Sequence, residues 1–185
     1  MYWYFYTPRN IVAPQMMHTV AYFKNMATGY DSVIQRCNCI LNQDYGTGMK
    51  LKTYPDLLVV ACDSDNVIQG FMVVHHADST DAWEIGAASV VKGQSRNKLY
   101  GLLIQGTHDA VRVLMRHGIV EKAWMVRRVN KADMERRQFF ERLGFLCPDN
   151  WMDNLLSDQG YVPFDPFDTL LMKREVVVEV DSEEI

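Results

Sequence analysis

Three short apolar segments separated by two polar turns constrain the fold of this chain more than any other part of its sequence. The segments cover residues 57–62, 67–74 and 83–91. Turn-forming residues lie between them, Asp-Ser-Asp-Asn at 63–66 and Asp-Ser-Thr-Asp at 78–81. Because short turns of this chemistry join neighbouring antiparallel strands, the pattern predicts an antiparallel meander of three strands.

Apolar patterns on both sides of the meander predict a mixed α/β domain built around one sheet. Further strands are expected at residues 2–6, 121–127, 145–147 and 169–173, and helices from Pro14 onward, at 31–41, at 98–116 and from 130 to 143. Asn130 is the expected N-cap of the last helix, with Asp133 at its third position. Residues 42–53 are predicted to form a flexible connection, and residues 150–168 a loop rich in aromatic and acidic side chains.

Length and composition exclude several classes of protein. The chain has 185 residues, 48% of them hydrophobic, which suits one core; we expect a single domain over residues 1–175 and an acidic tail over 176–185. The net charge of −4 disfavours non-specific nucleic-acid binding. No apolar run suggests a membrane helix, and the first residues do not resemble a secretory signal, so a cytoplasmic location is expected. Four cysteines without a C-x-x-C pair predict neither a metal site nor a disulfide scaffold.

The junction between the third meander strand and the next helix, residues 90–101, carries the most chemistry. Backbone N–H groups at the start of a helix, together with the helix dipole, bind phosphate or pyrophosphate groups. Lys92, Arg96 and Lys98 add positive charge there, and Gly101 allows close approach to the backbone. An ordinary strand–helix connection with exposed basic residues explains the same spacing, so the residues alone leave both interpretations open.

This junction and the order of the elements resemble the GNAT (GCN5-related N-acetyltransferase) superfamily. The family's segment reads Arg/Gln-x-x-Gly-x-Gly/Ala, and its backbone amides hold the pyrophosphate of acetyl-CoA. The six positions here are Arg96, Asn97, Lys98, Leu99, Tyr100 and Gly101. The outer two match the pattern, whereas its first glycine is replaced by Leu99. The hairpin at 63–71 and the segment Phe-Phe-Glu-Arg-Leu-Gly-Phe at 139–145 also resemble family segments, so the likeness covers residues 57–147 and, by element order, the first 50.

The resemblance implies a central, mostly antiparallel sheet flanked by helices, with a splayed strand pair at the cofactor site. It also implies an N-acetyltransferase that uses acetyl-CoA as co-substrate. A primary amine of an unidentified small molecule or protein would attack the thioester directly in a ternary complex. The backbone of Ser89, Val90 and Val91 would hold the acetyl oxygen and the pantetheine arm, and Asn130 and Phe140 occupy further cofactor positions.

Two side chains are candidates for proton transfer under this resemblance. Glu84 lies early in the third meander strand, where some family members carry a glutamate, and is the candidate general base; a solvent-facing strand carboxylate beside Trp83 is the alternative. The family's usual acid for the departing thiolate is a tyrosine at the position of Phe140, which has no proton to give. Tyr161 in the late loop or water would then serve, or the reaction would be slow or absent.

A second hypothesis belongs to a different class of protein. Leu99 and Phe140 also favour a GNAT-like fold that has lost catalysis and serves as a binding or structural module in a larger assembly. The aromatic residues 2–6 would then form an interface rather than a core strand. Under either hypothesis a homo-oligomer or an assembly partner is possible, and neither nucleic acid nor a membrane is an expected partner.

Overall fold

The computed structural model describes residues 2–6, 29–46, 48, 50–51, 56–77, 82–93, 95–116, 122–147 and 169–178. They fall into two compact units, each made of two stretches of chain. The first unit holds Met1–His75 and Ile85–Ala110, and the second holds His76–Glu84 and Val111–Ile185. The helix predicted from Pro14 and the loop predicted at 150–168 lie outside the described residues.

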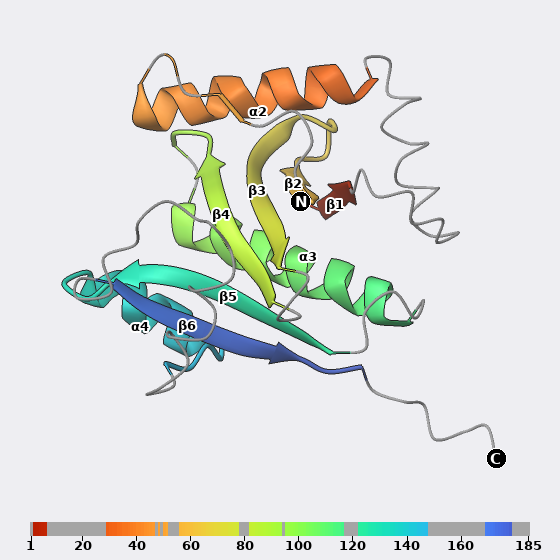
Figure 1. The fold of residues 1–185 in the computed structure, drawn as a ribbon. Coiled ribbons are helices and arrows are strands. Elements are labelled where there is room, and N and C mark those ends of the chain that lie inside the picture. Colours follow the sequence, from red (N-terminus) through yellow and green to blue (C-terminus); the bar gives the residue numbers. More distant parts are fainter. Residues whose placement is uncertain are drawn as a thin grey trace. The chain divides into compact units, whose positions relative to one another are not determined.

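The strands of the sheet follow the order of the chain, β1-β2-β3-β4-β5-β6, in a six-stranded arrangement. β1 (Tyr2–Tyr6) pairs antiparallel with β2 (Leu57–Cys62), and β2 pairs antiparallel with β3 (Ile68–Ala77). β4 (Ala82–Val90) instead runs parallel to β5 (Ala123–Asn130). This mixed sheet with flanking helices confirms the predicted fold class (Figure 1).

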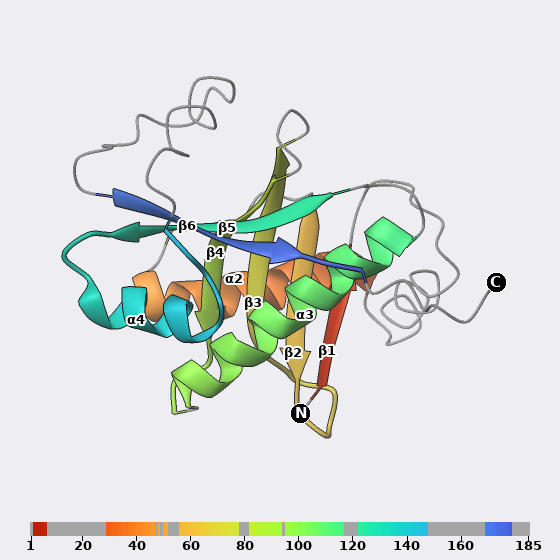
Figure 2. The same cartoon turned by 90° about the horizontal axis from the view of Figure 1, so that it is seen from below.

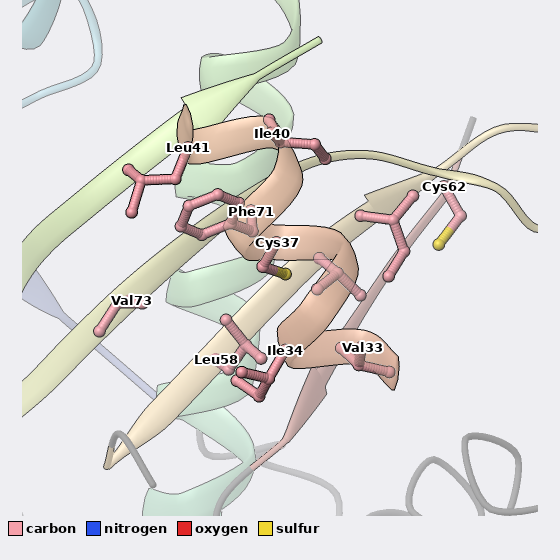
Figure 3. Close-up of a cluster of buried hydrophobic side chains, with 11 residues drawn as sticks. Val33, Ile34, Cys37, Ile40, Leu41, Leu58, Cys62, Phe71 and Val73 are labelled. Carbon is pink, nitrogen blue, oxygen red and sulfur yellow. The ribbon is translucent and has the colours of Figure 1, made fainter. Parts of the chain in front are cut away.

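One face of β2 and β3 in the first unit is covered by α2 (Gly29–Tyr45). The cluster residues of α2 recur at helical spacing, and those within each of the two strands mostly recur at every second position, so one side of the helix meets one face of the strands. Figure 3 shows these side chains meeting in one cluster, which comprises Val33, Ile34, Cys37, Ile40, Leu41, Leu58, Val60, Cys62, Ile68, Phe71 and Val73.

The opposite face of the same strands is covered by α3 (Arg96–Arg116), as the views in Figures 1 and 2 show. The Thr107 hydroxyl contacts the Met72 sulfur at 3.4 Å. A β-carbon on Gly106 would lie only 2.8 Å from the Trp3 ring, so a glycine is needed for β1 to approach the helix. The predicted strand at residues 2–6 is therefore confirmed, and its Trp3 packs against α3.

The elements of the first unit begin and end close to their predicted limits, with one difference that bears on the site. β2 has the predicted limits, and α3 begins two residues early, at Arg96. α2 continues to Tyr45, four residues beyond the predicted end. The sequence from 42 to 45 contains no glycine or proline, and its polar side chains suit a last helical turn as well as a connection.

The second unit is built on β5 and β6 (Thr169–Val176), which pair antiparallel from Ala123↔Val176 to Asn130↔Thr169. The first three residues of β4 complete it on the other side of β5, with Ala82 opposite Trp124 and Glu84 opposite Val126. β6 extends three residues beyond its predicted end, to Val176. The strand predicted at 145–147 is reduced to a single bridge between Leu146 and Lys173.

The N-cap predicted for α4 (Met134–Arg142) is wrong. Asn130 is the last residue of β5, and Asp133 caps the helix, its side chain accepting the Arg136 N–H at 3.0 Å. The Asn130 side chain instead accepts the Ala132 N–H at 2.8 Å and so stabilises the turn that joins strand to helix. Asn and Asp are both favourable caps. Because β5 continues to Asn130, the helix begins later and Asp133 becomes its cap.

The described part of the chain contains no helix that is both long and apolar enough to span a bilayer. Within the same residues, no three His, Cys, Asp or Glu side chains are grouped closely enough to hold a metal ion. All four cysteines are free thiols: Cys37 and Cys62 are buried, Cys147 is half-buried and Cys39 is exposed.

Candidate functional site

The first turn of α3 presents backbone donors that the helix does not use. The Leu99 N–H donates to the Ser95 carbonyl at 3.0 Å, which is the first helical hydrogen bond. The N–H groups of Arg96, Asn97 and Lys98 therefore have no acceptor within the helix, and all three residues are exposed. These are three of the positions that the sequence predicts for cofactor binding.

The charge around this turn favours an anion. Lys92, Arg96 and Lys98 are all exposed, and the first turn of α3 contains no acidic residue. The N-terminal end of the helix dipole adds a partial positive charge at the same place. The junction is thus locally basic within a chain whose net charge is −4.

Asp44 is a site residue that the sequence analysis missed. It lies in the last turn of α2, and its carboxylate accepts hydrogen bonds from the Ser89 hydroxyl and from the Arg96 guanidinium. The Asp44 side chain is 5% exposed, whereas that of Arg96 is 60% exposed. One carboxylate therefore links the end of α2, the end of β4 and the start of α3.

β4 departs from a regular strand just before this junction. A β-carbon on Gly86 would lie 3.0 Å from the His75 ring, and His75 shares a face of β3 with Phe71 and Val73, the face that α2 covers. Ser89 is on the same face, because its hydroxyl contacts Asp44 of α2. Residues three apart lie on opposite faces of a regular strand, so the alternation shifts by one residue between Gly86 and Ser89. Such an irregularity takes backbone groups out of the strand ladder.

The end of β4 is tied to both of its neighbours in the first unit. The Val91 N–H donates to the Gln69 carbonyl of β3 at 2.8 Å. The Tyr100 hydroxyl, in the first turns of α3, donates to the Ala88 carbonyl at 2.8 Å. Since successive residues of a strand direct their N–H groups to opposite edges, the Val90 N–H points away from β3.

Three other predicted residues of this segment are buried. The exposed fractions of Ser89, Val90 and Leu99 are 0%, 0% and 2%. Leu99, which replaces the first glycine of the family pattern, is thus a core residue of α3. A β-carbon on Gly101 would meet no atom within 4 Å, so the space beside this glycine is open.

Glu84, the candidate base, belongs to the second unit and forms an ion pair with Arg128. Glu84 Oε1 lies 2.8 Å from Arg128 Nε, and Glu84 Oε2 lies 3.1 Å from an Arg128 terminal nitrogen. The parallel register places Glu84 opposite Val126, so Arg128 is two residues further along the same face of β5. The Glu84 side chain is only 15% exposed, which contradicts the alternative of a solvent-facing carboxylate.

Phe140, at the position of the family's acid, is part of an aromatic cluster in the second unit. It is 6% exposed, and its ring packs edge-on against Phe139 at 5.5 Å and Phe145 at 5.1 Å between centroids. Asn130 is exposed in the same unit. Tyr161 lies outside the described residues. The structure therefore brings the predicted residues from Ser89 to Gly101 together in the first unit, and places the other described ones in the second.

Comparisons with known proteins identify the fold. No family model matches the chain, and no curated protein matches its sequence. The solved structure of the aminoglycoside 6'-N-acetyltransferase from Enterococcus faecium is similar to it with a TM-score of 0.58 and 12% identity, over 98% of this chain and 100% of that one. The structure of Tetrahymena GCN5 is similar with a TM-score of 0.54 and 14% identity, over 98% of this chain and 99% of that one. The structure of a GNAT-family acetyltransferase from Staphylococcus aureus is similar with a TM-score of 0.51 and 12% identity, over 80% of this chain and 93% of that one. The chain has the fold of the GNAT acetyltransferases.

Proposed function

We propose that this chain is an acetyl-CoA-dependent N-acetyltransferase that acts on a primary amine. The observation that carries the proposal is the first turn of α3, where three unused backbone N–H groups and exposed basic side chains coincide. This combination suits the pyrophosphate of CoA, which carries a negative charge on each of its two phosphates. The fold supports the same assignment, because the similar solved structures are named as acetyltransferases.

The residues of the junction fit CoA in a specific way. The N–H groups of Arg96, Asn97 and Lys98 would hold the pyrophosphate, and the open space beside Gly101 leaves room for it. Among Ser89, Val90 and Val91, the Val90 N–H is the donor best suited to the acetyl oxygen or pantetheine arm, because the Val91 N–H is already bonded to β3. Leu99 itself is buried, whereas the three residues that precede it in the turn are exposed.

Acetyl-CoA supplies an activated thioester, and the chain has to accept one proton and provide another. The acceptor nitrogen forms a bond to the thioester carbon, the carbon–sulfur bond breaks, and the amine loses a proton. We assign that proton to Glu84, whose carboxylate Arg128 holds in a fixed orientation through two contacts. The thiolate takes its proton from Tyr161 or from water, since Phe140 has none to give.

Thermal denaturation with and without acetyl-CoA tests the first part of the proposal. A ligand at 100 times its Kd stabilises the folded state by about 2.7 kcal/mol. For a chain of this size, that energy raises the Tm by about 5–10 °C. An unchanged Tm at millimolar acetyl-CoA would rule out the assigned cofactor.

Acetyl transfer to a panel of primary amines, followed through release of free CoA thiol, tests the second part. Glu84→Gln keeps the shape of the side chain but cannot accept the proton, so we expect turnover to fall about 100-fold or more while acetyl-CoA affinity is unchanged. Glu175→Gln is the matched control: Glu175 is an exposed carboxylate on β6 of the same unit, and this variant should retain full turnover. Equal turnover of wild type and Glu84→Gln would remove Glu84 as the base.

A non-catalytic binding module is the second candidate function. The observation in its favour is the aromatic cluster around Phe140, which fills the position of the family's acid with a buried hydrophobic ring. This candidate predicts that acetyl-CoA binds and raises the Tm, while no amine in the panel accelerates the release of CoA thiol.

A further inference from the structure

We propose that Asp44 is a positioning residue: it holds the Arg96 guanidinium in place for the phosphate of the ligand. This inference rests on the proposed function and assigns a role in it to a residue of α2. Asp44 does not touch the ligand in this account. It acts through Arg96, whose guanidinium it contacts, and its own orientation is fixed by the Ser89 hydroxyl.

Exposure separates the two partners of this ion pair. Asp44 is nearly completely buried, so it is out of reach of a bound anion, whereas 60% of the Arg96 side chain is exposed. Arginine has five N–H donors arranged in a rigid plane. The contact with Asp44 uses one terminal nitrogen of Arg96 and leaves the other donors for a phosphate.

The carboxylate of Asp44 is itself held in place. Ser89 is fully buried in β4, and its hydroxyl donates to one Asp44 oxygen while Arg96 contacts the other. An arginine on a helix surface normally samples many rotamers, and fixing it on binding costs affinity. Here the rotamer is fixed before the ligand arrives, because α2 and β4 together anchor the carboxylate.

The charge of the first turn gives Asp44 a second effect with the opposite sign. Two cations, Arg96 and Lys98, lie at the positive end of the α3 dipole, which is unfavourable without a nearby anion. Asp44 supplies a negative charge there, and that charge also repels a phosphate. Positioning strengthens ligand binding, whereas repulsion weakens it. A substitution at Asp44 therefore raises the Kd if positioning dominates and lowers it if repulsion dominates.

The test measures the affinity of the full chain for coenzyme A by isothermal titration calorimetry. The variants are Asp44→Ala, Asp44→Asn, Arg96→Ala and the double variant Asp44→Ala/Arg96→Ala. Asp109→Ala is the matched control, because it removes the same charge from the same unit and its carboxylate accepts from the exposed Gln105 side chain at 2.9 Å, away from the first turn. Thermal denaturation of each variant verifies that it is folded.

We expect Asp44→Ala to raise the Kd about three- to tenfold, the range associated with ordering one long side chain on binding. Asp44→Asn retains one acceptor oxygen without the charge, so its Kd should rise about twofold. Asp109→Ala should bind like wild type. In the Arg96→Ala background, the Asp44 substitution should not raise the Kd further, because the side chain that it positions is absent; the loss of the repulsive charge should leave the Kd equal or lower.

The outcomes distinguish failure of the proposed function from failure of the role assigned to Asp44. If wild type does not bind coenzyme A, the proposed function fails and the role of Asp44 fails with it. If wild type binds but Asp44→Ala binds equally or more tightly, the positioning role alone is overturned. Losses that add in the double variant also overturn it, since Asp44 would then act independently of Arg96. If Asp44→Ala does not fold, Asp44→Asn carries the test, and equal or tighter binding by that variant refutes the role.

Discussion

Leu99 occupies the glycine position of the family pattern, and it is a core residue of α3 that is only 2% exposed. We expect Leu99→Ala to lower the free energy of unfolding by about 3 kcal/mol. The three carbons removed account for about 2.4 kcal/mol at about 0.8 kcal/mol for each buried methylene. The cavity that remains adds to this loss. Leu99→Gly, which restores the family residue, should lose about 1 kcal/mol more, because glycine destabilises a helix relative to alanine.

Urea denaturation followed by circular dichroism measures this difference. With a denaturant dependence of about 2 kcal/mol per molar, a loss of 3 kcal/mol lowers the midpoint by about 1.5 M. Leu102→Ala is the matched control, since Leu102 lies on the same helix three residues later and is half-buried. The same substitution there should shift the midpoint by less than half as much.

A loss below about 1 kcal/mol for Leu99→Ala would refute this reasoning, because a fully buried leucine cannot be truncated so cheaply. The side chain would then lie outside the core and next to the ligand site. The expected loss instead separates two properties of this position. Leu99 stabilises the helix through its side chain, and the proposed anion site uses the N–H groups that precede it.

Two further predictions concern the cysteines and the first hairpin. Burial, together with the Asp63 carboxylate, raises the pKa of Cys62 to about 11, and burial raises the pKa of Cys37 further. Iodoacetamide at pH 8 should therefore label the exposed Cys39 first and Cys37 only after unfolding. Equal labelling rates for Cys37 and Cys39, measured by mass spectrometry, would contradict this. Hydrogen bonds from the Val67 and Asp65 N–H groups and from the Gln69 amide lower the pKa of Asp63 below 3.8. This stabilisation is present above the unfolded-state pKa and is lost as pH falls through the folded-state pKa. The difference between the urea midpoints of wild type and Asp63→Asn should therefore shrink steadily as the pH is lowered from about 6, whereas a constant difference would show that the charge is not responsible.

Local sequence patterns were sufficient for the strands of the first unit. The continuous apolar run predicts β2, and the Asp-rich turn after it determines where the strand ends, because the Asp63 carboxylate accepts from the Asp65 and Val67 N–H groups. The buried stripe of α2 is likewise visible in the spacing of its apolar residues. In these cases the interactions that determine structure lie within a few residues of each other.

The parts of the site that the sequence did not predict depend on distant residues. Asp44 contacts Ser89 and Arg96, which are 45 and 52 residues away in the chain. The ion pair between Glu84 and Arg128 spans 44 residues and exists because β4 and β5 are parallel neighbours. No local pattern distinguishes such a carboxylate from an exposed one. The start of α3 was predictable to within two residues, but the side chains that contact its first turn were not.

The parallel pairing at the start of β4 has a consequence for dividing this protein into fragments. Among the residues that the structure describes, three, Ala82–Glu84, pair with β5 on the side away from β6, and they come from a stretch of chain that precedes α3. A fragment beginning at Val111 would contain β5, α4 and β6 but would leave one edge of β5 without a partner. Unpaired strand edges of this kind join to other chains and promote aggregation. The short parallel segment thus covers part of this strand edge, and a fragment of the second unit should include residues 76–84.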